Sequence, residues 1–155
     1  MKNEKGQSLA ELILAFGVVS IVIVSVVGLM TKSVSNLTFS RNKSLATRMA
    51  YKTMEWIRTE RDNNWQYIYS RSATSSGITY CVVDSVLIHT SWPPSAGSCS
   101  STQYVTGTNF RREVNLTITD IAYSTVRSRV TVFWSDAQGT HQIVSESLFT
   151  NWQGI

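Results

Sequence analysis

Residues 12–30, LILAFGVVSIVIVSVVGLM, contain neither a charged residue nor a proline. A helix rises about 1.5 Å per residue, so a helical run of this length spans about 28 Å, close to the thickness of a bilayer's hydrocarbon core. The run therefore predicts a single-pass membrane helix. Lys2 and Lys5 precede it, which favours a cytoplasmic N-terminus and an exported remainder. The alternative is a cleaved secretory signal, but no convincing small-x-small cleavage site follows the run.

The composition excludes several functional classes. The chain has 155 residues, enough for one domain with a modest core, and its net charge of +4 is too mild and scattered to predict nucleic-acid binding. The sequence contains no catalytic constellation, no Gly-rich phosphate loop and no metal-ligand spacing, so we expect no enzyme activity, no cofactor and no metal. His89 and His141 have no local acidic partner in the sequence and are assigned to surface or strand positions.

A second helical pattern follows the apolar run. Apolar residues recur at steps of three and four within residues 45–57, namely Ala46, Met49, Ala50, Met54 and Ile57. No helix breaker separates this pattern from the apolar run. We therefore predict one helix from about residue 8 to about residue 60, apolar all round at first and amphipathic later. Asp62-Asn63-Asn64 favour its end, because these residue types occupy turns and caps.

The later part of the chain has the alternation of β-strands. Apolar residues alternate with polar ones in EVNLTIT (113–119) and VRSRVTVFW (126–134), SDAQG (135–139) forms a turn, and THQIVSESLFTNW (140–152) returns as the partner strand. ITYCVV (78–83) and SVLIHT (85–90) are further short β-type runs. An antiparallel sheet of about three to five strands needs a cover for one face, and the amphipathic half of the helix is the candidate. The predicted fold class is α+β, a long N-terminal helix packed on an antiparallel sheet.

Cys81 and Cys99 bound a Ser/Pro/Gly-rich loop and are the only cysteines. If the domain is exported, a disulfide between them is expected, whereas in a reducing compartment both remain free thiols. Trp92 lies in this loop beside Pro93-Pro94, and its position makes it the candidate for an exposed surface contact. Trp56 and Trp134, in contrast, are assigned to the core.

Lys5-Gly6-Gln7-Ser8-Leu9-Ala10-Glu11 leads into the apolar run, and with it resembles the N-terminus of the type IV pilin family, which includes minor pilins and the pseudopilins of type II secretion. The family signature is a short basic leader ending in Gly, a cut, Glu five residues after the cut, and an apolar helix. Gly6 matches the last leader residue, Gln7 the new N-terminus and Glu11 the acidic position, while Leu9 matches the apolar pattern around it.

Two later stretches are also similar to minor pilins. LATRMAYKTMEWIRTERDNNW (45–65) resembles a stretch found in some minor pilins, and RVTVFWSDAQGTHQIVSESLFTNW (129–152) resembles the closing hairpin of PilV-type minor pilins. Two departures accompany the resemblance. The family prefers Phe after the cut, where this chain has Gln7, and many pilins carry a proline in the apolar helix, where this chain has Gly28. The helix therefore lacks the proline that is thought to permit partial melting on assembly.

The resemblance implies an organisation and a set of partners. It implies a leader at 1–6, a membrane and filament-core helix at 7–30, an amphipathic half-helix at 31–64 and a β-rich head at 65–155. The partners it implies are other pilin subunits, a prepilin peptidase that also methylates the new N-terminus, a platform protein with its ATPase, and the membrane before assembly. Surface exposure on a filament would follow, and contact with DNA or a host surface is compatible with it.

Two functional hypotheses of different classes follow. The first is a structural subunit of a type IV pilus-like filament, a minor pilin or alternatively a pseudopilin of a secretion or DNA-uptake system. The second is a membrane-anchored extracellular binding module that never polymerises. The two differ in what Glu11 does, because only the polymer requires a partner for this carboxylate.

Overall fold

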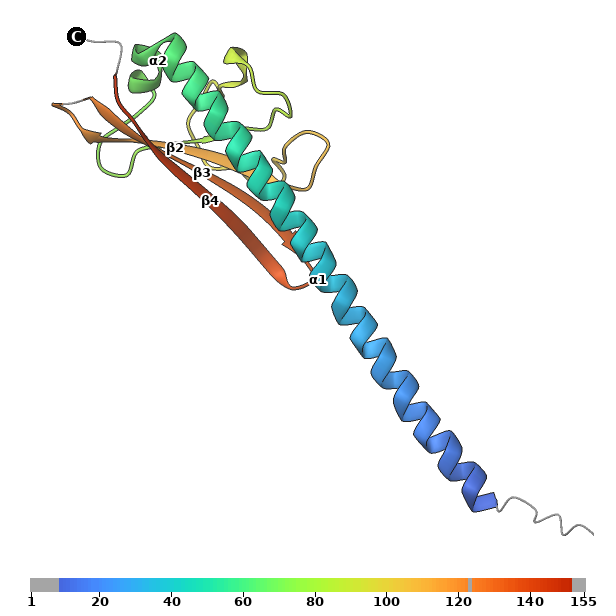
Figure 1. Cartoon of the computed structure of the whole chain (residues 1–155). Coiled ribbons are helices and arrows are strands. Elements are labelled where there is room, and N and C mark those ends of the chain that lie inside the picture. The colour runs from blue at the N-terminus through green and yellow to red at the C-terminus, as the bar shows by residue number, and fades with distance from the viewer. Residues whose placement is uncertain (1–8, 123, 152–155) are drawn as a thin grey trace, which may run out of the picture. The chain divides into compact units, whose positions relative to one another are not determined.

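The computed structural model describes residues 9–122 and 124–151 (Figure 1). The chain forms two compact units, with the boundary after Arg41. In chain order the elements are α1 (Leu9–Asn63), α2 (Trp65–Ser70), β1 (Ile78–Cys81), the short 3-10 helix η1 (His89–Ser91), β2 (Arg111–Asp120), β3 (Thr125–Asp136) and β4 (Gly139–Phe149). The α+β class is confirmed, since α1 packs its C-terminal part on a four-stranded antiparallel sheet.

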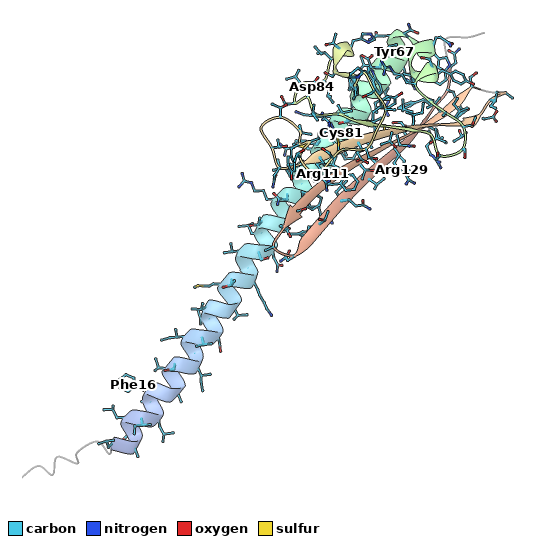
Figure 2. All side chains as sticks on the ribbon, turned by 180° about the vertical axis from the view of Figure 1, so that it is seen from behind. Phe16, Tyr67, Cys81, Asp84, Arg111 and Arg129 are labelled. Atoms are coloured by element: carbon cyan, nitrogen blue, oxygen red, sulfur yellow. A yellow bond between two sulfur atoms is a disulfide. The ribbon has the colours of Figure 1, made fainter. Side chains whose placement is uncertain are left out.

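The first unit is the N-terminal part of α1, whose apolar side chains are exposed all round. The side chain of Phe16, for example, is 64% exposed (Figure 2). The hydroxyls inside this part donate back to the carbonyl four residues earlier, Ser20 to Phe16 at 2.8 Å and Ser25 to Ile21 at 2.8 Å. These hydroxyl groups therefore find their hydrogen-bond acceptors inside the helix. Polar side chains need such internal partners wherever a helix is surrounded by hydrocarbon.

The second unit begins within α1, where the helix buries one face. Buried positions follow the predicted three- and four-residue spacing: Ala46, Ala50, Thr53, Met54, Trp56, Ile57 and Glu60. The helix ends at Asn63, within the turn-favouring segment that was predicted to stop it. A short helix, α2, then begins at Trp65, at the start of the segment for which a β-rich head was expected, and no helix was predicted there. The Asn64 side chain caps it by accepting a hydrogen bond from the Tyr67 amide at 3.1 Å.

The sheet has the order β1-β2-β3-β4 with every neighbour antiparallel, a simple meander. Cross-strand pairs such as Val114↔Val130 and Val132↔Ile143 bring the apolar positions of successive strands onto one face. The predicted inward residues of β2 and β3 are buried, except that Ile118 is half-buried beside a register shift between Ile118 and Asp120. The predicted roles of Trp56 and Trp134 as core residues are confirmed.

SVLIHT (85–90) was expected to be a strand, and this prediction is wrong. The segment is irregular and ends in η1, since its carbonyls accept from side chains instead of from a neighbouring strand. The Trp56 indole donates to the carbonyl of Ile88 at 3.1 Å, and the Ser91 hydroxyl donates to the carbonyl of Val86 at 3.2 Å. The Arg112 guanidinium donates to the carbonyl of Asp84, the residue just before the segment. The Trp56 and Arg112 bonds attach the segment and its start to α1 and β2 in a conformation that no strand ladder would give.

Candidate functional site

The α1 helix is long and apolar enough to cross a membrane, with a mean hydropathy of 2.9 over its best 18-residue window. Glu11 lies in its first turn and is exposed, as is Leu9. Among the described residues, none forms an ion pair or hydrogen bond with the Glu11 carboxylate. Gly6 and Gln7, the predicted processing site, lie outside the described residues.

A carboxylate at the start of an apolar helix has two physical consequences. The N-terminal end of the helix dipole favours its negative charge. Placing the same charge within the bilayer centre costs about 2.5–3.5 kcal/mol on insertion scales. Glu11 is therefore acceptable at the membrane edge, but deep in apolar surroundings it requires a cationic partner from elsewhere.

The expected disulfide is present: Cys81, the last residue of β1, is bonded to Cys99 (Figure 2 labels Cys81). Further bonds attach the same loop to the sheet. The Cys99 amide donates to the Glu113 carboxylate at 2.8 Å, and the Gly97 amide donates to the Thr79 carbonyl at 2.8 Å. The return of the loop onto β1 and β2 is thus secured covalently and by hydrogen bonds.

Removing the disulfide by the double substitution Cys81→Ser and Cys99→Ser is expected to lower the free energy of unfolding of the head by about 3 kcal/mol. The bridge closes a separation of 18 residues, and its loss returns that loop's freedom to the unfolded chain. Urea unfolding of the full chain in detergent measures the change. Wild-type protein under reducing conditions is the matched control and should unfold at the same urea concentration as the double variant. An unchanged midpoint in both samples would contradict this expectation.

Trp92 was predicted to be an exposed contact, and the structure contradicts this prediction. Its side chain is 5% exposed, with its ring centroid 4.5 Å from that of Trp56 and 5.7 Å, edge-on, from that of Tyr80. The indole N–H donates to the buried carboxylate of Glu60 at 3.2 Å. Pro93-Pro94 keep the chain out of a strand, but the preceding tryptophan turns inward because a large aromatic gains more from burial than from exposure.

Both histidines have acidic partners, so the expectation that neither has a local one is wrong for His141, whose partner Asp136 lies five residues away across the turn between β3 and β4. The Nδ1 of His89 lies 2.6 Å from a carboxylate oxygen of Glu60, and the Nε2 of His141 lies 2.9 Å from an oxygen of Asp136. Hydrogen bonding to His141 holds the pKa of Asp136 below its usual range. Within the described ranges, no group of three or more His, Cys, Asp or Glu residues is placed to hold a metal ion.

The Glu60 carboxylate organises this part of the head. It is 4% exposed and accepts from both Trp92 and His89, so that α1 is joined to the 88–92 segment. A buried carboxylate is tolerated when such donors satisfy it.

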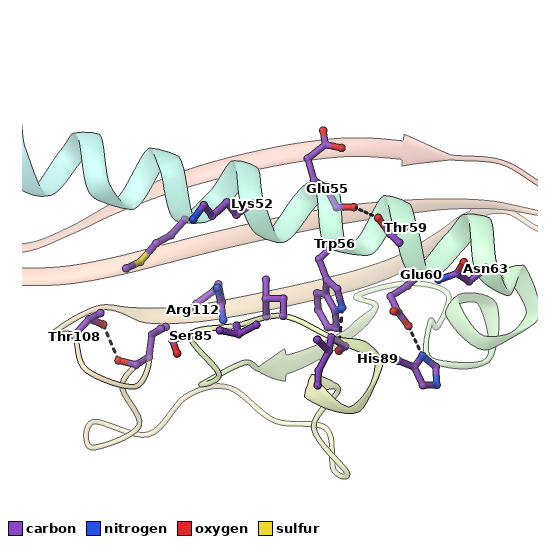
Figure 3. A pocket seen from close by; sticks show the side chains of 15 residues that line it. Lys52, Glu55, Trp56, Thr59, Glu60, Asn63, Ser85, His89, Thr108 and Arg112 are labelled. Carbon is purple, nitrogen blue, oxygen red and sulfur yellow. Dashed lines mark hydrogen bonds and ion pairs between the residues drawn. The ribbon is translucent and has the colours of Figure 1, made fainter.

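A groove of about 700 Å³ lies between α1 and the 85–89 segment (Figure 3). Arg112 of β2 contributes to its lining although the residue is only 3% exposed. Burial lowers the pKa of Arg112 to about 10, and the nearby Asp84 charge opposes this shift only in part. The group therefore remains cationic at neutral pH. The sequence pattern could have predicted that Arg112 faces inward, since it alternates in step with the inward-facing Val114 and Leu116.

Comparisons with protein-family models, with curated proteins and with solved structures find no match for this chain. The functional argument therefore starts from three features of the molecule. These are the apolar helix that begins with Glu11, the disulfide-closed loop on the sheet, and the groove beside Arg112.

Proposed function

We propose that the chain is a structural subunit of a type IV pilus-like filament, most similar to a minor pilin, that assembles through its N-terminal helix. The observation that carries the proposal is the Glu11 carboxylate, which opens an exposed apolar helix and has no partner among the described residues. The resemblance of residues 1–30 to the prepilin signal supports it, with Gly6 before the cut and Gln7 after it. A pseudopilin uses the same parts and is the alternative within this class.

Processing would supply the missing partner. Cleavage after Gly6 converts the Gln7 amide nitrogen into a terminal amine, which is positively charged at neutral pH. In a bundle of such helices, the amine of one subunit can pair with the Glu11 carboxylate of another. At about 4 Å and an effective dielectric constant of about 20, the attraction is about 4 kcal/mol before desolvation. A shifted subunit would leave the carboxylate unpaired, so this pair sets the axial register.

The proposal includes a route through the cell. The chain inserts as a single-pass protein of the cytoplasmic membrane with its N-terminus inside, and Lys2 and Lys5 favour this orientation. After processing, a platform protein and its ATPase transfer the subunit to a filament in which the head faces outward. The disulfide of the head agrees with export, because such bonds persist in oxidising compartments.

The competing proposal is a membrane-anchored binding module that does not polymerise. The groove between α1 and the 85–89 segment favours it, since an anchored head with a binding groove needs no filament. In this case the leader stays attached, Glu11 remains at the membrane surface, and no pairing with a second subunit occurs. The two proposals therefore predict different N-termini.

Intact-mass measurement and N-terminal sequencing of the protein from its native cells test the filament proposal. We expect a chain that begins at Gln7 and is about 14 Da heavier than its sequence mass, from one added methyl group. The matched control is Gly6→Val, which places a branched side chain beside the scissile bond and should leave the leader attached. A wild-type chain that still begins at Met1, or that is cut after residue 30, would reject processing and favour the anchored module or a secreted domain.

A further inference from the structure

The groove runs along the C-terminal half of α1. It is lined by helix residues from Met49 to Asn63 and closed on the other side by the 85–89 segment (Figure 3). Fourteen residue steps of helix correspond to about 21 Å, and an extended peptide covers that distance with about six residues. The shape is thus an open trough and differs from the compact cavity that encloses a small molecule.

The charges of the groove are unequally paired. Its two acidic residues already have partners: Glu55 forms an ion pair with Arg58 at 2.6 Å, and Glu60 is bonded to His89. Its two basic residues, Lys52 and Arg112, have no carboxylate within 4.0 Å in the part of the chain that the structure describes. Figure 3 shows them toward the same end of the groove, and Glu60 with His89 toward the other. Asp84, which does not line the groove, acts on Arg112 through its charge. Among the side chains that line the groove, the two cationic groups therefore lie together at the Lys52 and Arg112 end.

Arg112 is incompletely satisfied within the molecule. Its Nη2 donates to the Asp84 carbonyl, while its Nε is buried without an acceptor. A buried donor that lacks an acceptor costs about 1–3 kcal/mol, and more when the group is charged. The Nε itself is buried, but the guanidinium lines the groove, so a carboxylate that binds there would offset its positive charge.

The remainder of the groove is apolar and open. Val86 is 71% exposed and Ile88 is 57% exposed, although both belong to a segment that hydrogen bonds hold in place. Together with Trp56 of α1, they line the groove. Large apolar side chains kept exposed on an ordered segment are typical of an interaction surface.

We propose that this groove is a docking site for an extended segment of a partner protein, in which an acidic side chain is flanked by apolar residues. The acidic side chain faces Lys52 and Arg112, and the apolar side chains lie on Val86, Ile88 and Trp56. Arginine suits this role because its planar group binds carboxylates in a fixed orientation. The length of the trough favours a peptide over a small carboxylic acid. The proposal holds for a filament subunit and for an anchored module alike, because every residue it uses lies in the head.

The test measures peptide binding to the full chain in detergent micelles by fluorescence anisotropy. The probe is a labelled, capped hexapeptide pool with one central glutamate and leucine, isoleucine or phenylalanine at the other positions. The matched pool has glutamine in place of glutamate and is otherwise identical. We expect the glutamate pool to bind about tenfold more tightly, since only it places a charge beside the two cations.

Three variants locate the binding. Val86→Glu adds a negative charge and removes an apolar contact at an exposed position, and is expected to weaken binding of the glutamate pool about tenfold. Lys52→Gln should weaken binding of the glutamate pool severalfold. Lys52 is exposed, so this variant tests the charge without changing the buried Arg112. Val144→Glu introduces the same exposed change on β4, outside the groove, and should leave binding unchanged. Failure of the glutamate pool to bind, equal binding of both pools, or binding insensitive to Val86→Glu would overturn the proposal.

Discussion

Glu11→Gln is expected to insert into the membrane as well as the wild-type chain and to lose at least about nine-tenths of its incorporation into filaments. The substitution keeps the shape of the side chain and removes the charge that would pair with the processed N-terminus of a neighbouring subunit. A tenfold loss of incorporation corresponds to about 1.4 kcal/mol. The attraction is about 4 kcal/mol before desolvation, so a loss of this size is expected even when desolvation cancels more than half of the attraction. Quantitative mass spectrometry of sheared filaments and membrane fractions measures the ratio.

The control for this experiment is an acidic residue on the same helix. Glu55 lies in the head and forms an exposed pair with Arg58, so Glu55→Gln should incorporate normally. If Glu11→Gln enters filaments as well as the wild type, the carboxylate does not set the register and the filament proposal loses its main support. If no wild-type chain is found in filaments, the anchored module becomes the better account. Loss of Glu11→Gln from the membrane fraction would assign the residue a role in insertion.

Trp92→Ala is expected to lower the free energy of unfolding of the head by about 3–5 kcal/mol, the usual cost of removing a large buried aromatic. The ring lies between Trp56 and Tyr80, and its loss leaves a cavity beside the α1 helix. The same change removes the indole donor from the buried Glu60 carboxylate, so a polar penalty adds to the cavity. Thermal unfolding followed by near-ultraviolet circular dichroism should show a midpoint more than about 10 °C lower.

Two further variants separate the causes of this effect. Trp92→Phe keeps a six-membered ring and removes the pyrrole part of the indole with its N–H group, so it should cost less than Trp92→Ala, about 1–3 kcal/mol. Tyr51→Ala removes an aromatic side chain on α1 that is 65% exposed, and should change the free energy of unfolding by no more than about 0.5 kcal/mol. A Trp92→Ala protein as stable as the wild type would contradict the buried position and restore a role for this residue at the surface.

The parts of the fold that were predicted correctly depend on short-range patterns. The apolar run, the three- and four-residue spacing up to Ile57 and the alternation in β2 and β3 each repeat within a few residues. Neighbouring residues determine such periods, since a helix or strand repeats its orientation every 3.6 or 2 positions. The pairing of Cys81 with Cys99 was also predictable, because the chain has no other cysteine.

The parts that were missed depend on contacts between distant segments. Glu60 meets His89 and Trp92 across separations of 29 and 32 residues, and no local pattern relates these positions. The same contacts explain why Trp92 is buried although it stands beside two prolines in a loop. Other long-range bonds explain why the 85–90 segment is no strand: the Ile88 carbonyl accepts from the Trp56 indole of α1, and the Asp84 carbonyl just before the segment accepts from Arg112 of β2.

The sequence by itself therefore determined that the chain has a long apolar helix opened by Glu11, an amphipathic continuation, an antiparallel meander and one possible disulfide. Each of these follows from residue type and spacing along a short stretch. Only the tertiary structure decided which polar groups meet, because burial of Glu60 and Arg112 is acceptable only where distant donors and acceptors converge on them. The tertiary structure also decided that Val86 and Ile88 remain exposed in the groove that Lys52 lines. Among the described residues, Lys52 forms no ion pair within 4.0 Å, and the docking site is inferred from this arrangement.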